Sequence, residues 1–238
     1  QNNKNVLPIK LQADAHIYIL TPWLEQGAGI AAEIARLQEA GQLPRQIQVT
    51  FAKMSETDLA TEKSKIDKAN IVIVGNMTNR SLPITMQAKS GFRNLFSRYH
   101  ERSSLVFPEI PYGDNITIDS RDDQLSMQNK SNLSDGKFAY QALQYAKAQG
   151  KKTVFLSLLA PYDLPSYRDV ADVMLAGYDM YGYLVNEHGQ GYYRGPSMPA
   201  LTRIIFGVST AKAKLPIHVP NPAYPGEIVY WRGENSQG

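Results

Sequence analysis

The stretch "NIVIVGN", residues 70–76, decides the fold. Four branched aliphatic residues lead into Gly75, and no polar side chain interrupts them before Asn76. A strand that is apolar on both faces has to be covered on both sides, as the central strands of a parallel sheet are. The stretch "AHIYIL" (15–20) has the same character, so we expect both strands in the middle of one sheet.

Helical stretches separate the predicted strands. In "IAAEIARLQEAG" (30–41) the residues Ile30, Ile34 and Leu37 share one stripe, and a glycine ends the pattern. The preceding "TPWLEQGAG" (21–29) is typical of a turn.

The same alternation continues along the chain. "RQIQVTFA" (45–52) predicts a strand, and Ser55 with Asp58 predicts a capping box for a helix that runs to about Lys68. Later come a helix over 134–149, strands over 153–159 and 172–178 with a short helix between them, a helix over 198–207 and a terminal stretch over 213–220. This order predicts an α/β fold, a three-layer α/β/α sandwich with a mostly parallel sheet of flavodoxin or Rossmann type.

Length and composition limit the classes of protein to which the chain can belong. We expect residues 1–238 to form a single domain, expanded over about 80–133, where one helix is predicted at about 84–99. The net charge of +3 and the lack of basic blocks argue against nucleic acid, and no apolar run is long enough for a membrane span. The chain has no cysteine, and it opens without a methionine, so it reads as a piece of something longer.

The carboxyl ends of the strands are where a parallel sheet binds ligands, because helix N-termini and loops meet there. The segments that fall at this edge are Thr21–Gln26, Gly75–Arg80, Ala160–Asp163 and Tyr178–Gly182.

Asp163 allows three interpretations. It can cap the short helix that follows, act in catalysis together with Tyr162, or face a neighbouring domain. We favour capping, with Tyr162 as a half-buried packing residue.

Two segments near the strand ends each allow two interpretations. No acidic residue occurs between Asp67 and Glu101, so the basic residues there form either a solvated helix face or a docking surface. The Tyr- and Gly-rich stretch 177–196 either covers a sugar or a domain interface, or packs its tyrosines on its own backbone.

Several kinds of site lack their sequence pattern. There is no G-x-G-x-x-G, no P-loop and no G-x-S-x-G, and the four histidines are scattered, so we expect no cofactor and no metal.

Several stretches in order resemble one known domain. "KNVLPIKL", "GKKTVFLSLLAPYDL", "ADVMLAGYDMYG", "MPALTRIIFG" and "AKLPIHVP" are similar to the C-terminal domain of glycoside hydrolase family three. The likeness is greatest to the two-domain bacterial β-N-acetylglucosaminidases (β-hexosaminidases) of cell-wall turnover. It covers both ends of the chain and the middle of its second half, and it is weakest over about 80–133.

The resemblance implies that the catalytic groups lie in another domain. In that family an upstream (β/α)₈ barrel holds the sugar and carries an Asp nucleophile. Many members take an acid/base Glu from the loop after the strand that matches 70–76, but this chain has no acid there before Glu101. The N-acetylglucosaminidase branch uses an Asp–His pair on a barrel loop instead. The chain is therefore expected to be inactive alone and to buttress the barrel, which would cleave N-acetylglucosamine from peptidoglycan fragments.

The residues expected to face substrate or barrel lie at the predicted strand ends, and they are Asn76, Asn79, Arg80, Tyr162, Asp163 and Tyr181. The expected partners are the barrel of the same polypeptide and a glycan, and cell-wall work makes an exported location the expectation. Two rival functions remain: a free-standing module that binds carbohydrate or cell wall, and a flavodoxin-like or solute-binding domain that holds a small molecule.

Overall fold

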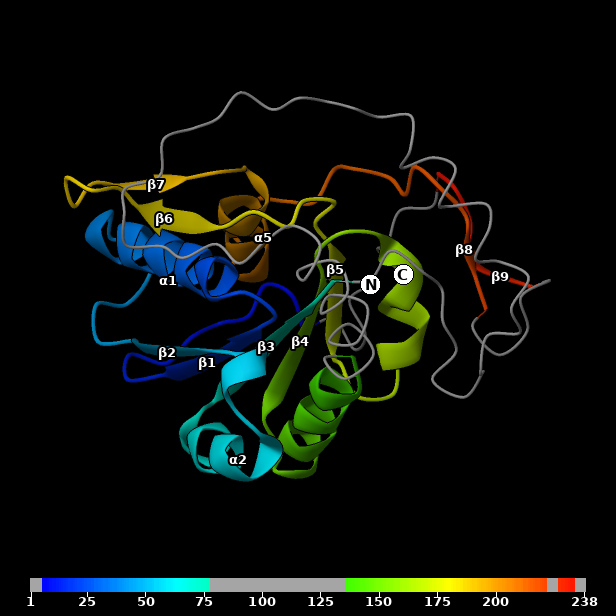
Figure 1. Ribbon diagram of the computed structural model, residues 1–238, viewed down its shortest axis with the longest axis horizontal. Coiled ribbons are helices and arrows are strands. Elements are labelled where there is room, and N and C mark those ends of the chain that lie inside the picture. The colour runs from blue at the N-terminus through cyan, green and yellow to red at the C-terminus, as the bar shows by residue number, and fades with distance from the viewer. Residues whose placement is uncertain (1–5, 78–135, 222–226, 234–238) are drawn as a thin grey trace.

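The computed structural model describes residues 6–77, 136–221 and 227–233 (Figure 1). The predicted helix at 84–99 and the predicted expansion over about 80–133 lie outside these ranges, as do Asn79 and Arg80.

Five parallel strands form the central sheet, in the order β2-β1-β3-β4-β5. They are β1 (His16–Thr21), β2 (Gln48–Lys53), β3 (Ile71–Asn76), β4 (Lys152–Ser157) and β5 (Val173–Ala176). This is a doubly wound order, and its direction reverses between β1 and β3. The predicted α/β sandwich is confirmed.

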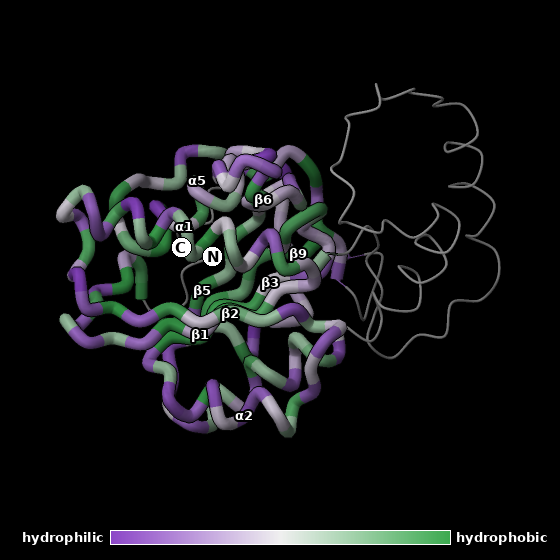
Figure 2. The backbone as a smooth tube through the Cα atoms, turned by 60° about the vertical axis from the view of Figure 1, so that its left-hand side comes forward, coloured by the Kyte–Doolittle hydropathy of each residue, from purple (hydrophilic) through white to green (hydrophobic). Residues whose placement is uncertain are grey.

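Helices cover both faces of the sheet (Figures 1 and 2). One face carries α1 (Leu24–Glu39) and α5 (Ser197–Ile205). The other carries α2 (Leu59–Lys68), the helix over residues 136–148 and the 3₁₀-helix η3 (Pro161–Tyr167). Along β1, Ile17 and Ile19 pack toward the first layer, and Tyr18 and Leu20 toward the second. All four are fully buried, which explains why this strand is apolar on both faces.

In the described part of the chain, two hairpins lie outside the sheet. β6 (Tyr183–Val185) pairs with β7 (Gly191–Tyr193) above α1, and β8 (Val219–Pro220) pairs with β9 (Ile228–Tyr230) near η3. The stretch 177–196 is thus partly a hairpin. A Cβ built on Gly191 would lie 1.6 Å from the Tyr183 hydroxyl, so this tyrosine is packed on its own hairpin backbone.

α1 begins at Leu24, so the prediction of a turn over 21–29 was wrong. The glycines that suggested a turn lie inside the helix, where they allow close packing. A Cβ on Gly27 would lie 3.1 Å from the Phe51 Cβ, and one on Gly29 would lie 3.0 Å from the Met198 Cβ.

α2 begins later than the sequence pattern predicts. A short 3₁₀-helix, η2 (Met54–Glu56), comes first, and Asp58 then caps α2 by accepting a 2.8 Å hydrogen bond from the Thr61 N–H. The capping role therefore belongs to Asp58 and not to Ser55.

No helix in the described part of the chain is both long and apolar enough to cross a membrane.

Glu33 joins α1 and α5, the two helices of the first layer. Its fully buried carboxylate accepts hydrogen bonds from Arg36 on α1, at 2.7 and 2.9 Å, and from Arg203 on α5, at 2.6 Å. Burial opposes its ionisation, but the two guanidinium groups outweigh that effect and hold the pKa of Glu33 below its usual range.

Replacing this carboxylate should loosen the α1–α5 contact. We expect Glu33→Gln to lower the free energy of unfolding by about 1–3 kcal/mol, because two guanidinium groups lose their charged partner. Denaturant titration measures the loss. Glu39→Gln, at an exposed position on the same helix, is the matched control and should stay within about 0.5 kcal/mol of the parent.

Candidate functional site

The strand ends named from the sequence meet along one edge of the sheet. Because the strands are parallel, Thr21, Asn76, Ser157 and Ala176 end β1, β3, β4 and β5 on the same side. The pairings Asn76–Ser157 and Ser157–Ala176 place three of these ends side by side. We call this side the carboxyl edge.

Gln26 occupies the point where the strand order reverses. Its side chain is fully buried in the first turn of α1. Oε1 accepts a 3.0 Å hydrogen bond from the Trp23 N–H, and Nε2 donates to the Met180 carbonyl at 2.8 Å and lies 3.1 Å from the Met77 sulfur. One carboxamide thus joins the ends of β1 and β3 to the loop after β5. It lies at the place where doubly wound folds bind their ligands.

The loop over residues 177–182 is fixed at both ends. On the β5 side, the Gly177 N–H donates to the Ser157 carbonyl at 2.8 Å, and the Ser197 hydroxyl donates to the Gly177 carbonyl at 2.7 Å. On the α1 side, Gly182 lies against the helix so closely that a Cβ there would sit 1.9 Å from the Glu25 carbonyl oxygen.

Tyr178 lies between these two anchors with a φ of 58°. Among the described residues it is the only one other than glycine with a positive φ. A bulky side chain is unfavourable in this region and persists only where the surroundings impose it. Tyr178 is nevertheless 41% exposed, so burial of the ring does not explain why a tyrosine occupies this position.

Asp163 lies at the centre of a buried polar cluster. Its Oδ2 accepts a 3.0 Å hydrogen bond from the Asn76 amide, and its Oδ1 lies 2.5 Å from the Ser157 hydroxyl. All three side chains are buried. The N-cap of η3 is Ala160, so the prediction that Asp163 caps this helix was wrong. The carboxyl group points instead to the ends of β3 and β4.

Burial dominates the ionisation of this carboxyl group. The Ser157 hydroxyl is a donor to Asp163 Oδ1 and also lies 2.7 Å from the Ala160 carbonyl oxygen, so its one hydrogen is shared between two acceptors. Burial raises the pKa of Asp163 to about 7, against the opposing effect of the hydrogen bonds that Ser157 and Asn76 donate to it.

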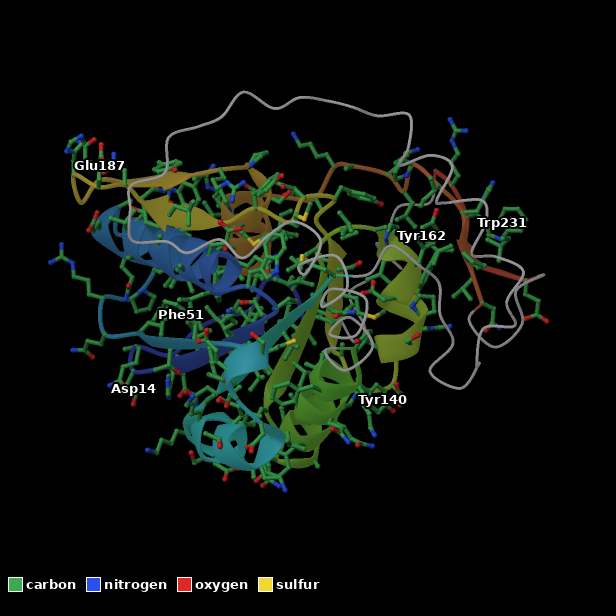
Figure 3. All side chains as sticks on the ribbon, viewed as in Figure 1. Asp14, Phe51, Tyr140, Tyr162, Glu187 and Trp231 are labelled. Carbon is green, nitrogen blue, oxygen red and sulfur yellow. The ribbon has the colours of Figure 1, made fainter. Side chains whose placement is uncertain are left out.

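The two predicted tyrosines differ in their surroundings. Tyr162 is half-buried at the start of η3 and lies beside Asp163 in the chain (Figure 3). Tyr181 is also half-buried, and the Arg194 guanidinium carbon lies 4.2 Å from its ring centre. Arg194 in turn pairs with Glu25 at 3.4 Å, so Tyr181 is engaged by the domain itself.

The sequence pattern did not single out Ser157, Gln26 or Tyr178 by itself. Ser157 had a signal, since it is the polar residue that interrupts the apolar run of β4. Gln26 and Tyr178 fell only within the segments predicted for this edge.

The cluster contains one acid, Asp163, and two side chains that hydrogen-bond to it. Its hydrogen-bonding partners, Ser157 and Asn76, supply no second carboxyl group for the paired-carboxyl mechanism of retaining glycosidases. Within the described ranges no group of three His, Cys, Asp or Glu residues could hold a metal ion.

The raised pKa of Asp163 predicts a pH-dependent variant effect. A pKa of about 7 in the folded state, against an ordinary 3.8, means that stability falls as the pH rises from about 4 to 7. Asp163→Asn removes this penalty. Its free energy of unfolding relative to the parent should therefore rise by up to about 3 kcal/mol between pH 5 and 8, measured by denaturant titration.

Asp14→Asn, at an exposed position, is the control and should show no such trend. A pH-independent difference for Asp163→Asn would mean that Asp163 ionises normally in the folded protein.

The backbone of Tyr178 predicts an unusual order of stabilities. Both Tyr178→Gly and Tyr178→Ala lose the ring contacts, but only glycine accepts a positive φ without cost. Tyr178→Gly should therefore melt above Tyr178→Ala, with a free-energy difference of about 1 kcal/mol. Thermal denaturation followed by circular dichroism tests this. The reverse order would mean that residue 178 is not strained.

Comparisons with known proteins place this geometry in context. No protein-family model matches the chain. β-Hexosaminidase A of Pseudoalteromonas piscicida is 36% identical over 77 residues, which are 32% of this chain and 12% of that protein. Among solved structures, a fungal multi-domain GH3 β-N-acetylglucosaminidase, described as having a GCN5-related glucosamine N-acetyltransferase region, matches with a TM-score of 0.52 at 19% identity.

The structural match covers 92% of this chain and 17% of the fungal one, and at this identity it concerns the fold. The chain thus spans about an eighth of the length of the bacterial hexosaminidase. It shares sequence with part of a hexosaminidase, and its fold with part of a glycoside hydrolase family three enzyme.

Proposed function

We propose that this chain is the C-terminal, non-catalytic domain of a glycoside hydrolase family three β-N-acetylhexosaminidase. Its parent would remove N-acetylglucosamine from peptidoglycan fragments by a retaining mechanism, in an exported setting. The chain's role is to buttress a (β/α)₈ barrel in the same polypeptide. The observation that carries the proposal is the 36% identity over 77 residues to a protein of which the match covers only 12%.

The contacts among the described residues fit a structural, non-catalytic role for this domain. The carboxyl edge holds one buried acid, Asp163, enclosed by Ser157 and Asn76, which suits a structural cluster better than an acid that exchanges protons with substrate. The loop over residues 177–182 covers part of the same edge and is anchored to α1 through Gln26. A rigid edge of this kind is suited to docking against a second domain.

Hydrolysis of a chromogenic N-acetylglucosaminide tests the proposal. The 238-residue chain alone should show none, whereas a polypeptide that also carries the barrel should be active. Asp163→Ala in that longer polypeptide should raise KM several-fold or weaken docking, because the cluster that fixes the strand ends is lost. Asp14→Ala is the control and should behave as the parent.

Two other results would contradict the proposal. Activity in the 238 residues alone would make the chain itself a catalyst. Inactivity of both polypeptides, together with micromolar affinity of the chain for muropeptides, would favour the free-standing carbohydrate-binding module.

A further inference from the structure

The two outer strands of the sheet differ in how well they are covered. On one side β5 is almost wholly buried, and Val173, Met174 and Leu175 are each exposed by 8% or less. On the other side β2 pairs with β1, and none of its residues is buried (Figure 1). Within the described part of the chain, no strand pairs with the outer side of β2. We call this side, formed by Gln48–Lys53, the β2 edge.

Every second residue of β2 presents its backbone to this edge. The Gln48 N–H donates to the Ala15 carbonyl at 2.9 Å, so Gln48 and Thr50 turn their backbone groups toward β1. Because successive residues of a strand direct their N–H and carbonyl groups to opposite sides, Val49 and Phe51 turn theirs outward. The β2 edge therefore offers a row of hydrogen-bonding groups that an added strand would satisfy.

The features by which natural proteins protect an edge strand are missing from most of β2. Residues 46–52, "QIQVTFA", contain no charge and no proline. All six residues of β2 pair with β1 in continuous register, so no bulge interrupts the strand. The lysine at its end, Lys53, is paired with Glu56 of the same chain at 3.0 Å. An exposed edge with these properties pairs with another strand unless something covers it.

Exposed apolar side chains lie beside the β2 edge. Phe51 is 39% exposed, and Leu24 in the first turn of α1 is 49% exposed. Gly27, one turn after Leu24, lies against the strand, since a Cβ built on it would be 3.1 Å from the Phe51 Cβ. Val49 is half-buried and packs toward the same helical layer. A strand added here would gain apolar contacts as well as main-chain hydrogen bonds.

We infer that the β2 edge pairs with the β2 edge of a second copy of this chain, antiparallel, so that the two five-stranded sheets join across a two-fold axis. Identical strands are complementary in an antiparallel pair, because each supplies the donors and acceptors that the other needs. With the axis at Thr50, Val49 lies opposite Phe51 of the second copy, and the two threonines face each other. Aromatic–β-branched pairs and Thr–Thr pairs are both favourable across strands.

The side chains favour this register over its neighbours. With the axis at Val49, Arg45 would lie opposite Lys53 of the second copy, and like charges directly opposite are unfavourable. With the axis at Phe51, Val49 would lie opposite Lys53 of the second copy in place of an aromatic ring. The axis at Thr50 avoids both arrangements, because Lys53 then lies opposite Ile47 of the second copy.

A single cysteine tests the register, because the chain has none of its own. At the axis the Cα atoms of the two facing Thr50 residues lie about 4.5 Å apart, a separation that a disulfide can span. Under mild oxidation Thr50→Cys should give a covalent dimer, seen by non-reducing electrophoresis. Ser64→Cys, at an exposed position on α2, is the matched control and should stay monomeric. Equal crosslinking of the two variants would overturn the inference.

Sedimentation velocity of the 238-residue chain measures the association itself. Pairing of one strand and a few apolar side chains makes a small interface, so the dimer should have a Kd of about 10–100 μM. Phe51→Lys places a charge on the edge and should weaken dimerisation by about tenfold or more, with an unchanged far-UV circular dichroism spectrum. Tyr192→Lys, at a 46% exposed aromatic position on β7, is the matched control and should dimerise like the parent.

Two further results would overturn the inference. One is a parent chain that stays monomeric at about 500 μM. The other is slow amide hydrogen exchange at Val49 in dilute, monomeric protein, since another segment of the same chain would then cover the β2 edge. Slow exchange at Val49 only at concentrations where the dimer forms would support the inference. None of these results bears on the hydrolysis experiment, so the proposed function stands or fails separately.

Discussion

The side chain of Gln26 is the constraint on which the carboxyl edge depends. Its carboxamide both donates and accepts, and it is buried at the point where the sheet reverses its order. Through it the start of α1 is joined to the end of β3 and to the loop after β5. Without this link the loop would lose its hydrogen bond to α1 at Met180, which acts beside the anchors at Gly177 and Gly182 to hold the backbone around Tyr178.

The carboxyl edge combines two features that do not favour stability. Asp163 is a carboxyl group in a site where burial disfavours its charge, and Tyr178 is a bulky residue in a left-handed conformation. Elsewhere the described domain follows ordinary rules, with apolar strands between two helical layers and the buried carboxylates of Glu33 and Glu62 paired with cations. A protein that keeps local costs on one edge of an otherwise regular fold does so where that edge meets something else. This reasoning supports the proposal that the edge docks against a second domain.

The sheet was predictable because each strand carries its own signal. β1 and β3 are apolar on both faces, and that pattern fixes a parallel sheet covered by helices. The start of α1 was not predictable, since Gly27 and Gly29 look like turn residues until Phe51 and Met198 are seen against them. The contact between Asn76 and Asp163 joins residues 87 positions apart, and only the paired strands bring them together. The strain at Tyr178 has no sequence signal, because a glycine stands directly before it.

The most direct test of the central claim is amide hydrogen exchange at the carboxyl edge. Exchange would be compared between the 238-residue chain and a longer polypeptide that also carries the (β/α)₈ barrel. If the edge docks against the barrel, amides in residues 21–26 and 177–182 should exchange more slowly in the longer polypeptide. Residues 41–47, at the opposite edge, should be unaffected. The account would be contradicted if the amides of residues 21–26 and 177–182 exchanged at the same rate in the 238-residue chain and in the longer polypeptide.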